Sequence, residues 1–200
     1  MISEKVLEDM IFDALNGDSP IGFFLERGLD IRPRRTIAED TKIEVYRQVN
    51  CLIFGRLDVL VVFNSPGDTV YATVIELKIE DLKGADVGQV IRYSEFVRHR
   101  LKQESKSKKV VVRSILIGSH AVSIGSTSSA DAYLLSKQIP DLKICEFTIN
   151  ASGLSFMWYS NVMKQLCDDP EFADRNKEIY KKNKDDMVAI ARMSHEKEVV

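Results

Sequence analysis

Two carboxylates and an ammonium group occur on two neighbouring segments of the sequence. Glu76 and Lys78 are one residue apart in the stretch TVIELKI, and Asp58 lies in the stretch GRLDVLVVF. Two carboxylates held side by side repel each other unless a proton or a cation lies between them. A hard divalent cation such as Mg²⁺ or Mn²⁺ meets this need, because it takes oxygen ligands and keeps water molecules for a substrate.

The chemistry that such a site would support is the hydrolysis of a phosphodiester. We expect Asp58 and Glu76 to bind the metal ion, with the backbone carbonyl of Leu77 as a further oxygen ligand. The ammonium group of Lys78, beside a metal-bound water, could stabilise the charge developing on the attacked phosphate or orient the nucleophile. The sequence thus predicts one compact site spread over two strands.

Alternation of side chains indicates how the strands position these groups. Neighbouring side chains of a strand point to opposite faces, so Glu76 and Lys78 share one face of a strand over 69–79. In the preceding strand, over 52–63, Asp58 faces away from an apolar set. That set is Leu57, Val59, Val61 and Phe63. The two strands should pair as an antiparallel hairpin through the turn NSPGD, which would bring Asp58 close to Glu76.

Periodicity predicts the elements around this hairpin. An amphipathic helix over 3–15, with Ser3 as its N-cap, carries Glu8 as a further candidate acid that could reach the metal directly or through water. Glu4, one turn earlier, competes with Glu8 for that role. A second helix over 85–102 has apolar residues at helical spacing. The remaining expected elements are strands over 42–50 and 110–120, a helix over 128–139, a hairpin over 144–160 with Gly153 in its turn, and a charged helical tail.

This order of elements indicates an α/β (α+β) fold with a mixed central sheet flanked by helices. We expect residues 1–160 to form the domain and residues 161–200 a helical C-terminal extension. Of the 200 residues 44% are hydrophobic and 29% charged, which is ordinary for a globular protein. No apolar run is long enough to span a bilayer, and MISEKVLEDM lacks the apolar core of a secretory signal, so we expect a cytoplasmic protein with no membrane contact.

The positions of the cysteines, histidines and charged residues limit the kinds of functional site that we expect. The three cysteines and three histidines are scattered, and they match neither a disulfide framework nor a zinc or histidine metal site. Residues 81–113 hold nine Lys or Arg against four acids, and the stretch IRPRR adds three arginines. Each of these could belong to a solvated helix face or turn, but near a site they could together form a phosphate-binding surface.

The ordered motifs resemble the core of the PD-(D/E)XK nuclease superfamily, and more narrowly its branch of archaeal-type mismatch and related repair endonucleases. GRLDVLVVF, VIELK and QVIRY stand in the order in which that family has a Gly-Arg-x-Asp strand, a Glu-x-Lys strand and a Gln-x-x-x-Tyr helix. A helix bearing a Glu precedes them. The resemblance covers residues 1–120, and less specifically the hairpin up to 160. It implies a restriction-endonuclease-like αβββαβ core followed by the hairpin and tail.

On this resemblance Asp58, Glu76 and Lys78 match the catalytic motif, Gln89 the helix motif, and Glu8 the preceding helix. The implied activity is an Mg²⁺- or Mn²⁺-dependent endonuclease or exonuclease that cuts DNA in repair, restriction or processing, without an organic cofactor. A homodimer would allow both strands to be cut. The candidate nucleic-acid contacts are Arg34, Arg35, Arg56, Arg92 and Tyr93.

Other interpretations stay open. Asp58 could form an ion pair with Arg56 or Lys78, and the Glu76 and Lys78 pair could lie exposed at a sheet edge, where it would contribute little. Gln89 could face solvent, and Tyr93 could belong to the core. The fold could also be a catalytically silent module that binds nucleic acid or a protein partner, or a nuclease directed at RNA.

Overall fold

A computed structural model describes most of the region that was expected to form the domain. The described residues are 3–17, 29–31, 40–80, 82–105, 108–119, 132, 136, 138–150 and 153–158. The expected extension 161–200 and the candidate contacts Arg34 and Arg35 lie outside them, as does most of the expected helix over 128–139. The boundary near residue 160 therefore stays a prediction.

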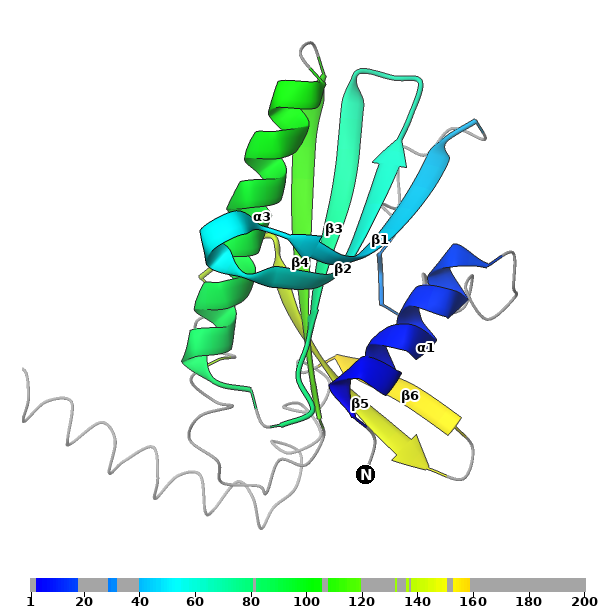
Figure 1. Cartoon of the computed structure of the whole chain (residues 1–200), viewed down its shortest axis with the longest axis vertical. Helices are drawn as coiled ribbons and strands as arrows, with labels where there is room; N and C mark the ends of the chain where they lie inside the picture. Colours follow the sequence, from blue (N-terminus) through cyan, green and yellow to red (C-terminus); the bar gives the residue numbers. More distant parts are fainter. Residues whose placement is uncertain are drawn as a thin grey trace, which may run out of the picture. The chain divides into compact units, whose positions relative to one another are not determined.

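The described elements are two α-helices, one 3₁₀ helix and six strands (Figure 1). The helices are α1 (Glu4–Asn16), α3 (Gly84–Glu104) and the 3₁₀ helix η1 (Leu52–Phe54). The strands are β1 (Lys42–Asn50), β2 (Arg56–Asn64), β3 (Thr69–Leu77), β4 (Lys109–Ser119), β5 (Leu142–Asn150) and β6 (Gly153–Trp158). Ser3 caps α1 as predicted, because its hydroxyl accepts a hydrogen bond from the N–H of Val6 at 3.3 Å.

All six strands form one mixed sheet, in the order β1-β2-β3-β4-β5-β6. The first three strands pair antiparallel, β3, β4 and β5 pair parallel, and β5 and β6 close with an antiparallel hairpin. In the sequence, α3 connects β3 to β4, which are parallel neighbours in the sheet. The α+β class with a mixed sheet and the predicted β2–β3 hairpin are thereby confirmed.

Both faces of the central strands are buried. On one face α1 packs against apolar side chains of the sheet. The shared core comprises Leu7, Ile11, Leu15, Leu29, Ile31, Val59, Val61, Phe63, Ile75, Leu77, Ile115, Ile117, Cys145 and Phe147. On the other face lies α3, where the hydroxyls of Ser94 on the helix and Ser114 on β4 are hydrogen-bonded. A charged side chain in the middle of β2 or β3 is therefore not a solvated surface residue.

Several element boundaries differ from the predicted ones, most of them by one or two residues. The second strand begins at Arg56 instead of residue 52, because η1 and Gly55, with φ of 105°, form a tight connection before it. The third strand ends at Leu77, although the N–H of Lys78 still donates to the carbonyl of Ile117 at 2.8 Å. Gly153 is the first residue of β6, paired with Asn150, and not part of the turn itself.

No helix in the described ranges combines the length and the apolar character needed to cross a membrane.

Gly118 on β4 makes room for the segment that joins β3 to α3. A β-carbon at this position would lie 2.5 Å from Cγ of Leu82, which is buried. We expect Gly118→Ala to lower the free energy of unfolding by about 1–3 kcal/mol, because Leu82 would have to move out of a packed core. Chemical denaturation measures this change. Gly67→Ala is the matched control, since its added carbon would be 3.8 Å from the Ser65 hydroxyl; an equal effect of both substitutions would contradict the explanation.

Candidate functional site

Asp58 and Glu76 occupy facing positions at the ends of β2 and β3. The antiparallel register pairs Val59 with Ile75 and Leu60 with Val74, so continuing it by one residue sets Asp58 opposite Glu76. Both side chains lie on the α3 face, and both are buried, with 5% and 1% of their surface exposed. The structure therefore brings the two predicted carboxylates together, in a position that water reaches poorly.

Hydrogen bonds hold one oxygen of each carboxylate. Oδ2 of Asp58 accepts from the backbone N–H of Leu77 at 2.8 Å. Oε1 of Glu76 accepts from Nζ of Lys78 at 2.7 Å, so Lys78 lies beside the pair as predicted. Oε2 of Glu76 is buried and has no hydrogen-bond partner within the described part of the chain. A buried carboxylate oxygen without a donor is unfavourable, and it indicates a position where a cation or water would bind.

The surroundings favour protonation of this pair when no cation is bound. Burial and the charge of Glu76 raise the pKa of Asp58 to about 8, although the Leu77 N–H opposes the shift. Burial also raises the pKa of Glu76, against the opposing effect of Lys78. For Lys78, burial lowers the pKa, but the hydrogen bond and charge of Glu76 outweigh it and the pKa is raised overall. Lys78 therefore stays positively charged at neutral pH.

Glu8 is connected to Asp58 by Gln48, which was not among the predicted site residues. Its Oε2 accepts a hydrogen bond from Nε2 of Gln48 at 2.6 Å, and the same nitrogen lies 3.4 Å from Oδ1 of Asp58. Gln48 stands opposite Asp58 in β1, where the ladder is interrupted and the backbone has φ of 50°. This local distortion redirects the Gln48 side chain, and no residue pattern in the sequence reveals it.

Glu4 also acts on the pair, through its charge. It raises the pKa values of Asp58, Glu76 and Lys78, which places it on the side of α1 that faces the site. Glu8 is in hydrogen-bond contact with the network, whereas no hydrogen bond joins Glu4 to it among the described residues. Which of the two acids would act on a metal ion stays a prediction.

Gln89 and Tyr93 form a hydrogen-bonded pair beneath the surface. Nε2 of Gln89 donates to the Tyr93 hydroxyl at 2.7 Å, which fixes the orientation of a half-buried amide. Tyr93 is only 1% exposed, so its ring lies below the surface rather than on it. A β-carbon at Gly55 would be 2.9 Å from the Tyr93 hydroxyl, so the glycine lets the hairpin backbone approach the helix.

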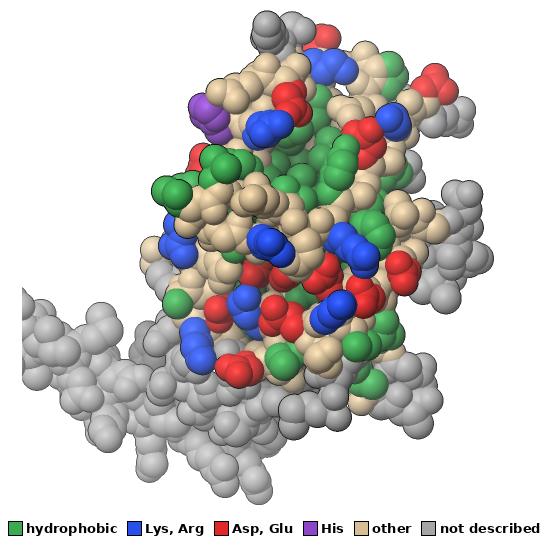
Figure 2. All heavy atoms as spheres, in the orientation of Figure 1, with side chains coloured by type: hydrophobic (Ala, Val, Ile, Leu, Met, Phe, Trp, Pro, Cys, Tyr) green, Lys and Arg blue, Asp and Glu red, His purple; other side chains and the backbone are tan. Residues whose placement is uncertain are grey.

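Two adjoining clefts open beside the carboxylates. One, of about 620 Å³, has Glu8 and Gln48 among its lining residues. The other, of about 310 Å³, is lined in part by Lys78 and Lys83, and Glu4 lines both clefts. Figure 2 shows acidic side chains gathered on this face of the molecule with basic ones around them.

Arg56 and Arg92, two of the candidate nucleic-acid contacts, are exposed. No ion pair to either arginine is found among the described residues, in contrast to Arg98 and Arg100, which pair with Glu95 and Glu104 along α3. Cations that lack an intramolecular partner remain available to a phosphate backbone.

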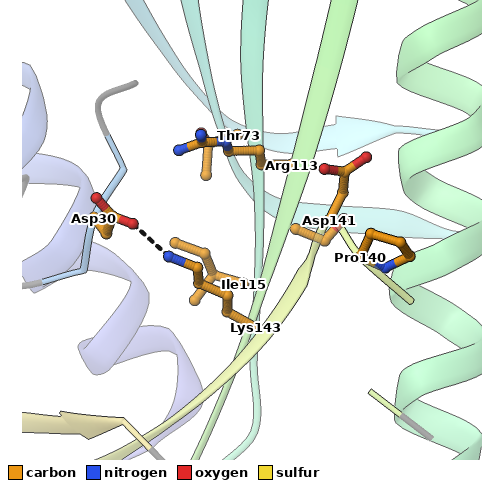
Figure 3. Close-up of a pocket in the computed structure, with 8 residues that line it drawn as sticks. Asp30, Thr73, Arg113, Ile115, Pro140, Asp141 and Lys143 are labelled. Atoms are coloured by element: carbon orange, nitrogen blue, oxygen red, sulfur yellow. Dashed lines mark hydrogen bonds and ion pairs between the residues drawn. The ribbon is translucent and has the colours of Figure 1, made fainter. Parts of the chain in front are cut away.

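A separate hollow of about 110 Å³ lies on the other face of the sheet. Thr73 and Arg113, register partners on β3 and β4, line it together with Lys143 (Figure 3). Lys143 is hydrogen-bonded to Asp30, so its charge is already balanced within the chain. Alternation puts Thr73 on the face opposite to Glu76. This hollow therefore has no part in the carboxylate site.

Asp58 and Glu76 are chemically suited to bind a divalent cation, but the described side chains alone do not form a complete coordination shell. Among the described residues, no group of three or more His, Cys, Asp or Glu side chains lies close enough together to hold a metal ion. Asp58 and Glu76 supply two carboxylates, and one oxygen of Glu76 is without a donor. Mg²⁺ is commonly held by only one or two carboxylates, with water and substrate oxygens as its other ligands. The expected contribution of the Leu77 carbonyl stays a prediction.

A purely structural ion pair explains this arrangement less well. Exposed pairs contribute at most about 1 kcal/mol, but removing charges from water costs several kcal/mol for each ion. Here two buried carboxylates have one ammonium group beside them, in contact with Glu76, so either one carboxylate binds a proton or one negative charge stays uncompensated. Groups with strongly perturbed pKa values of this kind are concentrated at functional sites.

Comparisons of the chain with protein-family models, with curated proteins and with solved structures gave no match. The function is therefore inferred from the residues of the chain itself and from their geometry.

The raised pKa of Asp58 makes stability depend on pH in a definite direction. An unfolded Asp titrates near pH 4, at about 3.9, whereas the folded pKa is about 8. Between these values the folded state keeps a proton that the unfolded state has lost, so stability falls as the pH rises. In EDTA, we expect Asp58→Asn to be more stable than wild type by about 1–3 kcal/mol at pH 8, with little difference at pH 4. Denaturant titrations at both pH values measure this.

The control for this measurement is Asp13→Asn, since Asp13 is exposed at the far end of α1. Its effect should be small and the same at both pH values. A gain for Asp58→Asn that does not grow between pH 4 and pH 8 would contradict the assignment.

Proposed function

We propose that this protein is a metal-dependent nuclease that hydrolyses phosphodiester bonds in DNA, built on a restriction-endonuclease-like version of its α+β fold. The observation that carries the proposal is the buried pair of Asp58 and Glu76, with Lys78 at its side and with one carboxylate oxygen that has no donor among the described residues. The matching order of the GRLD, ELK and QVIRY motifs supports the same function.

Each residue has a distinct part in this proposal. Asp58 and Glu76 hold Mg²⁺ or Mn²⁺, with the Leu77 carbonyl and Glu8 as further oxygen donors. The bound ion supplies Lewis acidity and lowers the pKa of a coordinated water. Lys78 donates hydrogen bonds toward the attacked phosphate and stabilises the charge that develops there.

Residues around the pair keep these groups in place. Gln48 connects Glu8 to Asp58 and limits the orientations that both carboxylates can take. Gln89, held by the Tyr93 hydroxyl, orients the substrate or the site. Arg56 and Arg92 contact the phosphate backbone, which positions the nucleic acid but does not read its sequence.

A catalytically silent module that only binds nucleic acid is the second candidate. A net charge of −2 is not that of a strongly basic nucleic-acid binder, so such a module would depend on local clusters of Lys and Arg. Retention of two buried carboxylates beside a lysine favours the enzyme, because a binding surface has no need of a site that is costly to bury. An RNA-directed nuclease would use the same groups, so the substrate panel must include RNA.

Metal binding should stabilise the folded state by an amount that grows with the free metal concentration. We expect the wild-type protein to melt at a temperature that rises with Mn²⁺ concentration, because a ligand that binds only the folded state stabilises it by mass action. At 100 times the dissociation constant the gain is about 2.7 kcal/mol. Thermal melting in Mn²⁺, with EDTA as the reference, measures the shift. Asp58→Ala should lose it and Asp13→Ala should keep it; an unchanged shift in Asp58→Ala would rule out Asp58 as a ligand.

The substitution Lys78→Ala tests whether Lys78 acts on the rate of cutting or on the binding of metal and DNA. Loss of one preorganised electrostatic contact to a reacting phosphate lowers the rate by a factor of about 10²–10³. We expect the variant to bind Mn²⁺ and DNA but to cut at this reduced rate, measured with labelled single-stranded, duplex and branched DNA and the matching RNA. Lys102→Ala, which removes an exposed cation of α3, serves as control and should cut normally.

Two results of that assay would count against the proposal. A Lys78→Ala protein that cuts as fast as wild type would exclude the catalytic role of the lysine. A wild-type protein that binds DNA with Mn²⁺ and cuts no member of the panel would favour the silent module. Preference for RNA over every DNA substrate would reassign the substrate while leaving the site intact.

A further inference from the structure

The connection between β1 and β2 presents apolar side chains to solvent. Leu52 and Ile53 in η1 are 71% and 92% exposed, and the next residue, Phe54, is 39% exposed. Single exposed apolar residues are ordinary on a protein surface. Three in succession at the end of a hairpin form a protruding apolar surface, which we call the tip, defined as Leu52–Phe54.

Hydrogen bonds and packing hold the tip in one conformation. The N–H of Cys51 donates to the carbonyl of Gly55 at 2.8 Å, and the N–H of Leu52 donates to Oδ1 of Asn50 at 2.9 Å. Cys51 is fully buried at one end, and Gly55 lies against the Tyr93 hydroxyl at the other. The exposure of Leu52 and Ile53 is therefore built into the fold and is not the result of a loose loop.

The residues of the tip are atypical for their conformation. Hairpin connections usually carry Gly, Asn or Asp, which accept positive φ and interact well with water. Leu52 instead has φ of 58°, a conformation that is disfavoured for a residue with a branched side chain. Strain and exposed apolar surface at one place are both unfavourable for folding, and together they indicate a contact made outside the chain.

The tip is next to the proposed nuclease site. Figure 1 shows the β1–β2 connection reaching across to α3, and η1 contacts that helix. Gly55 separates the tip from Arg56, the first residue of β2, and Asp58 lies two residues after Arg56 on the same strand. Only Gly55, Arg56 and Leu57 therefore separate the end of the tip from Asp58 in the sequence.

Charge around the tip favours a nucleic acid over an apolar protein surface. Arg56 and Arg92, exposed on β2 and on the helix that η1 contacts, have no ion pair among the described residues. An apolar protrusion with such cations beside it has the chemistry of side chains that enter a base stack, where Leu, Ile or Phe separates neighbouring bases and Arg holds the phosphates.

We propose, building on the proposed nuclease function, that Leu52 and Ile53 form a wedge that inserts between neighbouring bases of duplex DNA close to the bond that is cut. Unstacking one step bends the duplex and lets its backbone approach the buried carboxylates. Flexible pyrimidine–purine steps unstack more easily than A-tracts, so they are the better substrates at this position. The preferred substrate is thus a duplex whose bases unstack easily at the step where the wedge inserts.

The test compares a wedge variant with a matched variant elsewhere on the surface. Leu52→Ser with Ile53→Ser removes the apolar tip. Ile149→Ser with Met157→Ser changes two exposed apolar residues of β5 and β6 and is the control. The substrates are duplexes with 2-aminopurine at successive positions around the cut, containing either a TA step or an A-tract, and a duplex with an abasic gap in place of the step.

With the intact tip we expect 2-aminopurine fluorescence to rise several-fold at one position on binding, measured in the Lys78→Ala background so that cutting is slow. The wedge variant should lose this rise and cut intact duplex at least tenfold more slowly, while the abasic duplex restores its cutting because no stack has to be opened. A merely structural role of the tip would not produce that rescue. The control variant should behave as wild type on all substrates.

The outcomes separate the wedge from the nuclease proposal. If wild type cuts DNA and the wedge variant cuts equally fast with the same fluorescence, the wedge is excluded and the nuclease function stands. If wild type cuts no nucleic acid, the proposed function fails and the wedge fails with it. If sedimentation shows that the wedge variant only loses a dimer while unstacking persists, the tip contacts a second copy and the wedge is overturned.

Discussion

Repulsion between the carboxylates of Asp58 and Glu76 is the interaction on which the surrounding structure depends. Two negative groups at facing positions of a buried hairpin would destabilise it unless each acquired compensation. The N–H of Leu77 donates to Asp58 and the ammonium of Lys78 donates to Glu76, yet one oxygen of Glu76 has no donor within the described part of the chain. The fold therefore holds this pair in surroundings where both carboxylates cannot stay charged without a proton or a cation beside them.

Backbone strain is concentrated beside that pair. Of the four described residues with positive φ, Gln48, Leu52 and Gly55 lie in one short hairpin. Gln48 uses its conformation to reach Glu8 and Asp58, Gly55 lets the backbone approach Tyr93, and Leu52 holds an apolar side chain in solvent. Such conformations persist only where surrounding contacts fix them, and the buried Cys51 and the Tyr93 hydroxyl provide those contacts here.

Local pattern in the sequence was sufficient for the described α-helices and strands and for the central pair of Asp58 and Glu76. Period-two alternation correctly set Asp58 opposite to the apolar side chains of its strand, and it set Lys78 beside Glu76. The sequence did not reveal the role of Gln48, because that role arises from a dihedral angle and a ladder interruption. It also merged η1 with β2, since Leu52, Ile53 and Phe54 are apolar residues typical of strands and only their exposure distinguishes them.

The pairing of strands has a consequence for the order in which the chain can assemble. Asp58 and Glu76 belong to neighbouring antiparallel strands joined by a four-residue turn, so their contact closes a short loop. The parallel pairing of β3 with β4 must wait for α3, and such non-local contacts form slowly because more chain entropy is lost first. The acidic hairpin can therefore form before α3 docks on the sheet, while its charges are still in water. Desolvation of the two carboxylates then falls on the later packing of the elements around the hairpin, so this step, rather than hairpin formation, is the one that charge opposes.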